Sequence, residues 1–295
     1  MDAARLSPPR RLTVPIASRW GAGDMAVLDF GDPKRPVDLI FCHANGFNAA
    51  TYRSILAPLA SSLRILAPDL RGHGATRLPT QTAGRHDWHD HRDDLIALLE
   101  AFPGPRVVMA GHSMGGTSCL LAAAERPDRV SQLVLFDPVI WGGATAVVFR
   151  TPLLRGLTER IPLVRGARRR RAVFDSREQA LQAYRGRGAF KGWPDPVLID
   201  YLSDGLTAEG DGFVLSCAPD WEASNYTAQG HDPWRAMRTC RQPIRILKAE
   251  TDSIARVPEH PRGLPHVTVE TVPGGHLFPM VRADIVRDAL FDAAV

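Results

Sequence analysis

Hydrophobic and polar positions along the chain fall into short apolar runs separated by longer stretches with helical spacing. Runs rich in Val, Ile, Leu and Phe that end in polar or glycine residues are typical of buried strands. The runs of this kind lie at 12–16, 25–30, 37–42, 63–68, 106–110, 133–136, 244–249 and 267–272. The first two alternate enough to form an antiparallel pair, joined by a turn at 21–23.

Helix-compatible segments lie between most of these runs. Apolar residues with helical spacing, or runs of small residues, predict helices at 52–59, 89–101, 117–126 and 281–291. Strands that alternate with helices favour a mostly parallel sheet with helices on both faces. The predicted fold class is therefore α/β, with an eight-stranded sheet.

The alternation stops between residues 139 and 230. This stretch contains helix-like pieces but no convincing buried strand, and it far exceeds the length of an ordinary crossover. We therefore predict two units: a core made of residues 1–138 and 231–295, and an inserted helical cap, or lid, made of residues 139–230. An insertion after the strand at 133–136 falls on the edge where an open α/β sheet carries its chemistry, so we expect the cap to cover the site.

Composition narrows the classes of function. The chain has 295 residues, of which 44% are hydrophobic and 23% charged, and its net charge is +4. Much of the positive excess lies in the arginine-rich stretch 165–171, which predicts a solvated helix face rather than contact with nucleic acid or membrane. We see no signal peptide and no membrane span. The four cysteines lack a C-x-x-C spacing, which favours reduced thiols and a cytoplasmic location.

The stretch Gly111-His112-Ser113-Met114-Gly115-Gly116 carries the strongest chemical signal. An apolar run precedes it and a run of small residues follows, so Ser113 lies on a sharp turn between a strand and a helix. Glycines two positions before and two positions after the serine remove side chains that would clash there. We predict that Ser113 is a nucleophile, and that the Met114 N–H, at the start of the helix, is free to bind an anion.

A serine needs a base, and the base needs a carboxylate that fixes its tautomer. Asp252 and His276 each follow a later strand, so we predict a Ser113–His276–Asp252 triad. The order serine, aspartate, histidine is the one expected for this strand–turn–helix arrangement. Asp137 also ends a strand and remains the alternative carboxylate.

Together these residues resemble the α/β-hydrolase superfamily, and specifically its serine esterase-like members with a helical cap. The resemblance covers nearly the whole chain and rests on five segments: Asn45-Gly46-Phe47, 69–74, the Ser113 turn, Glu250-Thr251-Asp252 and Gly274-Gly275-His276. It implies that the Phe47 and Met114 N–H groups form an oxyanion hole. Family members usually carry His-Gly where this chain has Asn45-Gly46, with His43 two positions upstream, so the register of that loop stays open by a residue or two.

The resemblance also limits the reaction. Related dehalogenases and epoxide hydrolases use an aspartate where this chain has Ser113, so acyl transfer to water is expected, most simply by a carboxylesterase acting on a small or medium ester. The alternatives are a lactonase, a thioesterase, a carbon–carbon bond hydrolase of the meta-cleavage-product type, and a non-catalytic ligand-binding protein.

We expect contacts with a small-molecule substrate from the loop after the third strand and from the cap: His43, Asn45, Trp141, Trp193 and Trp221. No cofactor is expected. We also expect no metal, because the cluster His86, His89, Asp90 and Asp93 is better explained as a polar helix start.

Overall fold

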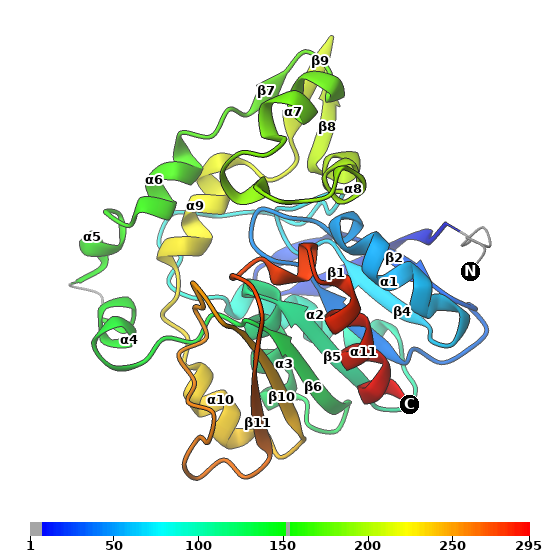
Figure 1. Cartoon of the computed structure of the whole chain (residues 1–295), viewed down its shortest axis with the longest axis vertical. Helices are drawn as coiled ribbons and strands as arrows, with labels where there is room; N and C mark the ends of the chain where they lie inside the picture. The colour runs from blue at the N-terminus through cyan, green and yellow to red at the C-terminus, as the bar shows by residue number, and fades with distance from the viewer. Residues whose placement is uncertain (1–7, 152–153) are drawn as a thin grey trace.

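The computed structural model describes residues 8–151 and 154–295 and contains one large sheet (Figure 1). Its eight strands, in spatial order, are β1 (Arg10–Ser18), β2 (Gly21–Phe30), β4 (Ile65–Pro68), β3 (Leu39–Cys42), β5 (Val107–His112), β6 (Val130–Phe136), β10 (Ile244–Ala249) and β11 (Val267–Val272). Strand β2 pairs antiparallel with β1 and β4, and all other neighbours are parallel. The predicted α/β fold class is confirmed.

The burial of each strand matches its sequence pattern. Strands β3, β4 and β5 are buried at every position, because helices cover both faces of the sheet there. Strand β1 lies at an edge and alternates between exposed and buried positions. The most apolar strands therefore lie at the centre of the sheet, and β5, which leads to Ser113, is one of them.

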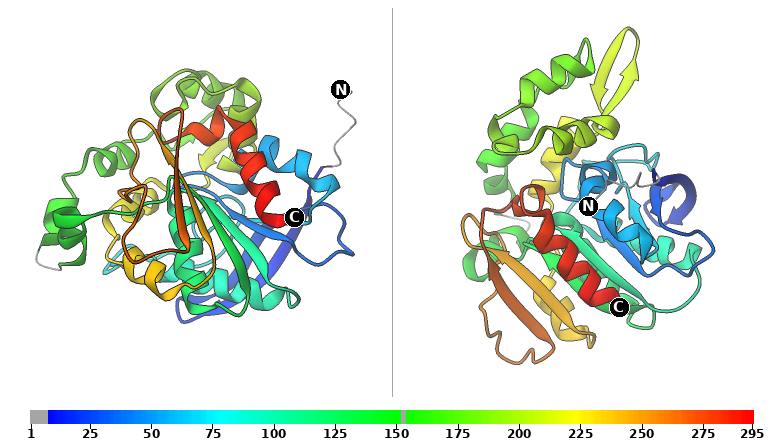
Figure 2. Two further views of the ribbon diagram at one scale, coloured as in Figure 1. Left: turned by 60° about the horizontal axis from the view of Figure 1, so that its bottom comes forward. Right: turned by 45° about the vertical axis from the view of Figure 1, so that its right-hand side comes forward.

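Helices pack against the sheet on two sides (Figure 2). Helices α1 (Arg53–Leu56) and α11 (Ala283–Ala294) cover one face, and α2 (His89–Ala101), α3 (Met114–Glu125) and α10 (Pro233–Thr239) cover the other. Helix α3 is buried from Met114 to Ala123, and its small residues let it pack closely against β5. The turn that carries Ser113 is thereby anchored in the core.

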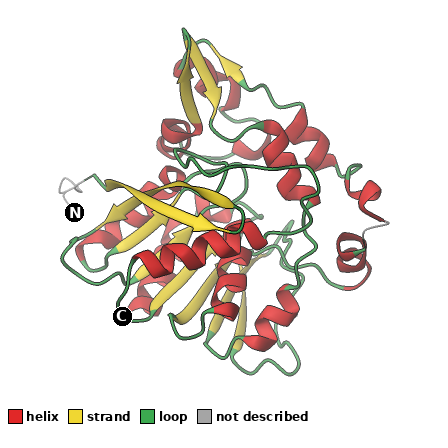
Figure 3. Ribbon diagram, turned by 180° about the vertical axis from the view of Figure 1, so that it is seen from behind, coloured by secondary structure: helices red, strands yellow, loops and turns green. Residues whose placement is uncertain are grey.

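The inserted segment, residues 139–230, lies at one end of the sheet (Figures 1 and 3). The α-helices and β-strands in its described residues are α4 (Gly143–Arg150), α5 (Arg155–Thr158), α6 (Pro162–Arg168), β7 (Val173–Phe174), α7 (Arg177–Tyr184), α8 (Asp195–Gly205), β8 (Leu206–Glu209), β9 (Gly212–Leu215) and α9 (Pro219–Thr227). The segment contacts the loop after β3, where the Asn48 side-chain amide donates to the Tyr201 carbonyl at 2.9 Å.

A purely helical insertion was expected, and the structure differs. Strands β7, β9 and β8 form a separate antiparallel three-stranded sheet. A tight turn at Gly210, which has a φ of +56°, joins β8 to β9. These strands are short and mostly not buried, so they carry no apolar run of the kind from which strands can be predicted.

Candidate active site

Ser113 lies at the strained turn between β5 and α3. Its φ and ψ are 54° and −120°, a conformation that a residue with a side chain rarely adopts. The neighbouring chain is too close for other side chains, since a Cβ on Gly115 would lie 2.3 Å from the Cys42 carbonyl oxygen and one on Gly111 would lie 2.6 Å from the Gly115 carbonyl carbon. The predicted role of the two glycines is thus visible as direct backbone packing. Ser113 itself is 6% exposed.

His276 joins the serine to a carboxylate. Its Nε2 lies 3.1 Å from the Ser113 Oγ, and its Nδ1 lies 2.6 Å from Oδ2 of Asp137. An ionised carboxylate only accepts hydrogen bonds, so the proton of the neutral ring lies on Nδ1. Nε2 is then the acceptor that faces the serine hydroxyl. This is the arrangement in which an imidazole can act as a general base towards a serine.

Asp137 follows β6 and is held by several donors. Its oxygens accept hydrogen bonds from the Ala249 N–H (3.0 Å), the Ser253 hydroxyl (2.5 Å) and the Ile254 N–H (3.1 Å). Burial opposes the charged form, but the hydrogen bond and charge of His276 together with these donors outweigh it, so the pKa of Asp137 lies below its ordinary value. The carboxylate therefore stays ionised beside the imidazole.

The expectation that Asp252 supports His276 is corrected by this geometry. Asp252 is exposed, and its φ is +54° in the loop beyond β10. Strand β6 lies between β5 and β10, and Asp137 directly follows its last residue. The carboxylate that His276 contacts therefore follows β6, the strand next to β5, and not β10. The two residues after Asp252, Ser253 and Ile254, serve as donors to Asp137 instead.

The loop after β3 also differs from the expectation. The Phe47 N–H, expected in the oxyanion hole, donates to the Ala44 carbonyl at 3.1 Å and is therefore already used in a turn. Among the residues that the structure describes, no acceptor is found for the Asn45 N–H or for the Met114 N–H. Met114 begins α3, where backbone N–H groups lack helical partners. The Met114 N–H, next to Ser113 in the chain, and the Asn45 N–H, in the loop after β3, are therefore available to bind an anion.

Two of the expected substrate contacts hold this loop in place. His43 is fully buried: its Nε2 accepts from the Leu70 N–H at 2.9 Å, and its Nδ1 donates to the Ala44 carbonyl at 2.8 Å. Desolvation lowers the pKa of His43 well below its ordinary value, so the ring is neutral. The Asn45 side chain bonds to α9 of the insertion, donating to the Glu222 carbonyl at 3.0 Å and accepting from Asn225 at 2.7 Å.

The three tryptophans have different surroundings. The Trp193 ring packs edge-on against Phe47 at 5.2 Å, and its buried N–H has no partner within the described residues. The Trp221 N–H donates to the Arg71 carbonyl at 2.8 Å, and the indole fills the space above Gly72. Trp221 is thus part of the packing between insertion and core.

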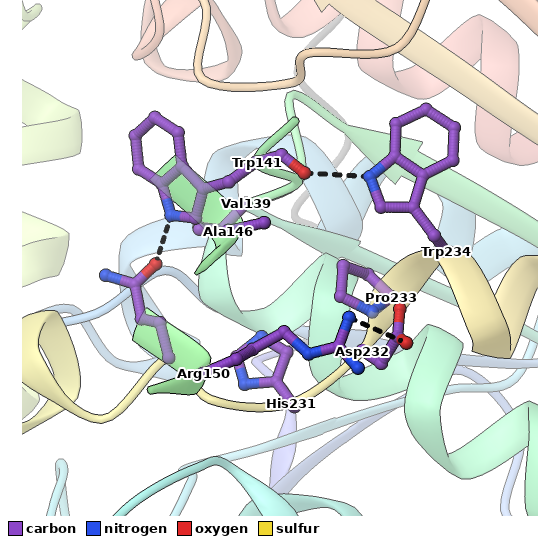
Figure 4. Close-up of a pocket in the computed structure, with 9 residues that line it drawn as sticks. Val139, Trp141, Ala146, Arg150, His231, Asp232, Pro233 and Trp234 are labelled. Carbon is purple, nitrogen blue, oxygen red and sulfur yellow. Dashed lines mark hydrogen bonds and ion pairs between the residues drawn. The ribbon is translucent and has the colours of Figure 1, made fainter. Parts of the chain in front are cut away.

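Trp141 lines a small hollow of about 20 Å³ between the two connections of the insertion (Figure 4). Its N–H donates to the Gln229 side-chain oxygen at 2.6 Å, and its carbonyl accepts from the Trp234 N–H at 2.7 Å. Arg150 and Asp232 form an ion pair across the same hollow at 3.0 Å. These contacts join the start of the insertion to its last residues and to the core residues that directly follow it.

The polar cluster at the start of α2 is occupied by ion pairs. Asp90 binds the Arg85 guanidinium at 2.7 Å, and Asp93 binds Arg19 at 3.0 Å. No group of three or more metal-ligating side chains is found among the described residues. Within the same residues, no helix is both long and apolar enough to cross a membrane.

Sequence reasoning missed two polar residues at the site, the buried Tyr52 and the half-buried Ser253. The Tyr52 hydroxyl accepts from the Ala44 N–H at 3.2 Å, and the Ser253 hydroxyl binds Asp137. Tyr52 was placed on a helix by its spacing, and Ser253 lies in a loop without periodicity. Neither position carries a local signal, because their partners are distant in sequence.

Comparison with known proteins agrees with this architecture. A model of the alpha/beta hydrolase family matches residues 39–289. An uncharacterised protein of Mycobacterium tuberculosis is 32% identical over 130 residues, which are 43% of this chain and 36% of that protein. The magnesium-chelatase 30 kDa subunit of Rhodobacter capsulatus is 27% identical over 288 residues, 93% of this chain and 92% of the subunit.

Among solved structures, E-2-(acetamidomethylene)succinate hydrolase superimposes with a TM-score of 0.72 and 21% identity, covering 96% of this chain and 98% of that one. For the first curated relatives, the matched region is only about a third of their own length, 36% for the mycobacterial protein.

Proposed function

Because the chain belongs to the alpha/beta hydrolase family, we propose that it is a serine hydrolase that cleaves a small or medium carboxylic ester through an acyl-enzyme intermediate. One observation carries the proposal. Ser113, His276 and Asp137 are joined by consecutive hydrogen bonds of 3.1 and 2.6 Å. A serine hydroxyl is a weak nucleophile at neutral pH, and this chain of contacts is what activates it.

The proposed reaction has two halves. In the first, the Ser113 Oγ attacks the ester carbonyl while Nε2 of His276 takes its proton, and the Asp137 carboxylate stabilises the imidazolium that forms. The tetrahedral intermediate collapses, and His276 gives the proton to the leaving alcohol. In the second half, His276 removes a proton from water, and the resulting hydroxide attacks the acyl-enzyme. Collapse then releases the acid and returns the proton to Ser113.

We assign the oxyanion hole to the N–H groups of Met114 and Asn45, in place of Phe47. Support comes from the hydrogen bonds: the Phe47 N–H is used by the Ala44 carbonyl, and within the described chain the other two N–H groups lack an acceptor. Two donors aimed at the developing negative charge stabilise the transition state, and removing one typically costs about 3–4 kcal/mol.

Residues 139–230 are proposed to be the cap that shapes the substrate pocket, on a core of residues 1–138 and 231–295. The contact of Trp193 with Phe47 and the bonds from Asn45 to α9 support this, because both join the segment to the loop beside Ser113. The substrate is proposed to be a small molecule. All four cysteines are free thiols, which supports the proposed cytoplasmic location, where thiols stay reduced.

The test is labelling with a fluorophosphonate followed by a substrate screen. We expect the probe to modify Ser113, as read by peptide mass spectrometry, and Ser113→Ala to abolish labelling. The screen compares p-nitrophenyl esters of increasing chain length with thioesters, lactones, amides, E-2-(acetamidomethylene)succinate and a meta-cleavage product. Preference for one of the last five classes would replace the ester by that substrate. Failure of Ser113 to react with the probe would favour the ligand-binding alternative.

A further inference from the structure

Two buried side chains beside the triad take no part in the reaction derived above. Tyr52 precedes α1, and His112 is the last residue of β5; both side chains are fully buried. The Tyr52 hydroxyl lies 2.7 Å from Nδ1 of His112. Two residues that are 60 positions apart in sequence are thus joined immediately below Ser113.

This pair extends in both directions to the backbone of other parts of the site. The Ala44 N–H, in the loop after β3, donates to the Tyr52 oxygen at 3.2 Å. At the other end, Nε2 of His112 lies 2.9 Å from the main-chain carbonyl oxygen of His276. The loop after β3, the nucleophile turn and the loop of the proposed base are therefore connected by three consecutive hydrogen bonds.

The direction of each bond follows from its two ends. A carbonyl oxygen only accepts, so Nε2 of His112 carries the proton and donates to His276. In a neutral ring Nδ1 is then an acceptor, and the Tyr52 hydroxyl must donate to it. The Tyr52 oxygen remains free to accept from the Ala44 N–H. Burial lowers the pKa of His112 to about 3 and raises the pKa of Tyr52, so both groups are neutral at ordinary pH.

We propose that His112 is a positioning residue that fixes the main chain of His276 relative to Ser113, and that Tyr52 sets the tautomer of the His112 ring. This inference rests on the proposed function. The His276 side chain is held by Asp137, and its main-chain carbonyl is held by His112. No other donor to that carbonyl is found among the described residues. The base is thereby fixed at two points on different elements.

The second anchor matters because of the sequence before His276. Gly274, with a φ of +113°, and Gly275 give that loop little conformational restriction of its own. During acyl transfer the imidazole must serve first the Ser113 Oγ and then the leaving group, while its backbone stays in place. A displacement of about 1 Å in such an arrangement can cost ~10²-fold in rate.

Two substitutions at His112 separate its two hydrogen bonds. An asparagine oxygen can stand near the place of Nδ1 and keep the bond to Tyr52, whereas a glutamine N–H can stand near the place of Nε2 and keep the bond to the His276 carbonyl. We expect H112N to lower kcat by roughly 10- to 100-fold with KM little changed. We expect H112Q and Tyr52→Phe to stay within about fivefold of wild type.

The kcat of each variant is compared with its melting temperature, since H112N and H112Q each lose one buried hydrogen bond and Tyr52→Phe loses two. Equal losses of kcat in H112N and H112Q, or losses that follow the melting temperature alone, would overturn the proposal. If the variants do not fold, histidine ¹⁵N NMR of the wild-type protein decides: a His112 ring protonated on Nδ1 would refute the network. The NMR result does not depend on turnover, and Ser113 labelling tests the hydrolase function separately.

Discussion

Asp137 and His276 are 139 residues apart in the chain, yet their side chains lie 2.6 Å from each other. The contact depends on strand order, because β6, which ends just before Asp137, is the neighbour of β5, which ends just before Ser113. Asp137 accepts three further hydrogen bonds, two of them from the loop that follows β10. That loop thus supports the carboxylate and does not supply it.

Asp137→Asn should lower kcat for ester hydrolysis by about 10⁴-fold, because an amide there favours the wrong imidazole tautomer. Asp252→Asn is the matched control and should cost less than about threefold, since its side chain is exposed. The kcat of each variant is measured under conditions in which both proteins are folded to the same extent. The opposite ranking would show that Asp252, in the loop after β10, is the carboxylate that supports His276.

Ser113→Ala should leave the fold intact and reduce hydrolysis by several orders of magnitude, with only the rate due to binding and the oxyanion hole remaining. The variant loses the hydrogen bond from the Ser113 hydroxyl to His276, so the free energy of unfolding measured in denaturant should change by less than about 1.5 kcal/mol. A folded variant that keeps more than a few per cent of wild-type activity would exclude Ser113 as the nucleophile.

Most of the fold could be predicted because its signals are local. The helix expected at 89–101 is α2 (His89–Ala101), and the strand expected at 244–249 is β10 (Ile244–Ala249). Continuous apolar runs indicate strands buried on both faces, and glycines around Ser113 indicate a turn where backbones meet. The small sheet of the insertion lacked such a signal, since its strands are short and half-exposed.

The choice between Asp137 and Asp252 could not be made from the sequence, because both end a strand and both follow the serine. Spatial strand order and the direction of the His276 ring decide it, and neither is a local property. The same holds for the loop after β3: the residues suggest a donor, but the hydrogen bond from Phe47 to Ala44 appears only in three dimensions. His43 and Trp221 proved to be packing and anchoring residues for the same reason.

Trp193→Ala should change the ratio of kcat/KM between short and long acyl chains by about tenfold, because its ring contacts Phe47 beside the proposed oxyanion loop. Trp221→Ala should act differently. Its indole is 2% exposed and fills the space above Gly72, so its loss should destabilise the fold by about 3–5 kcal/mol. Esterase assays and denaturant unfolding on both variants check this. Equal scaling of all substrates in Trp193→Ala would contradict the cap proposal.

The remaining prediction concerns acid sensitivity and starts from buried imidazoles. Burial lowers the pKa of His73, His112 and His231 to about 3 and that of His91 to about 4. Unfolded histidines bind protons near pH 6.5, so between pH 6.5 and 4 the unfolded chain carries more protons on these groups. Their contribution to stability is therefore present above pH 6.5 and is lost as the pH falls, by about 1.4 kcal/mol per pH unit for each ring.

Two buried carboxylates oppose this effect. Burial raises the pKa of Asp69 to about 7 and that of Asp94 to about 6, so the folded chain gains these protons first as the pH falls. They offset about two of the five buried rings, His43 included, so the protein should be several kcal/mol less stable at pH 5 than at pH 7. Denaturant unfolding at pH 5 and at pH 7 measures the difference.

His231→Phe should reduce this difference in stability by up to about 2 kcal/mol, because the ring packs on Trp88 at 4.5 Å and its Nδ1 has no partner within residues 8–151 and 154–295. The exposed His260→Gln is the control, and equal stability of the wild-type protein at pH 5 and pH 7 would show that these rings are not held neutral by the fold.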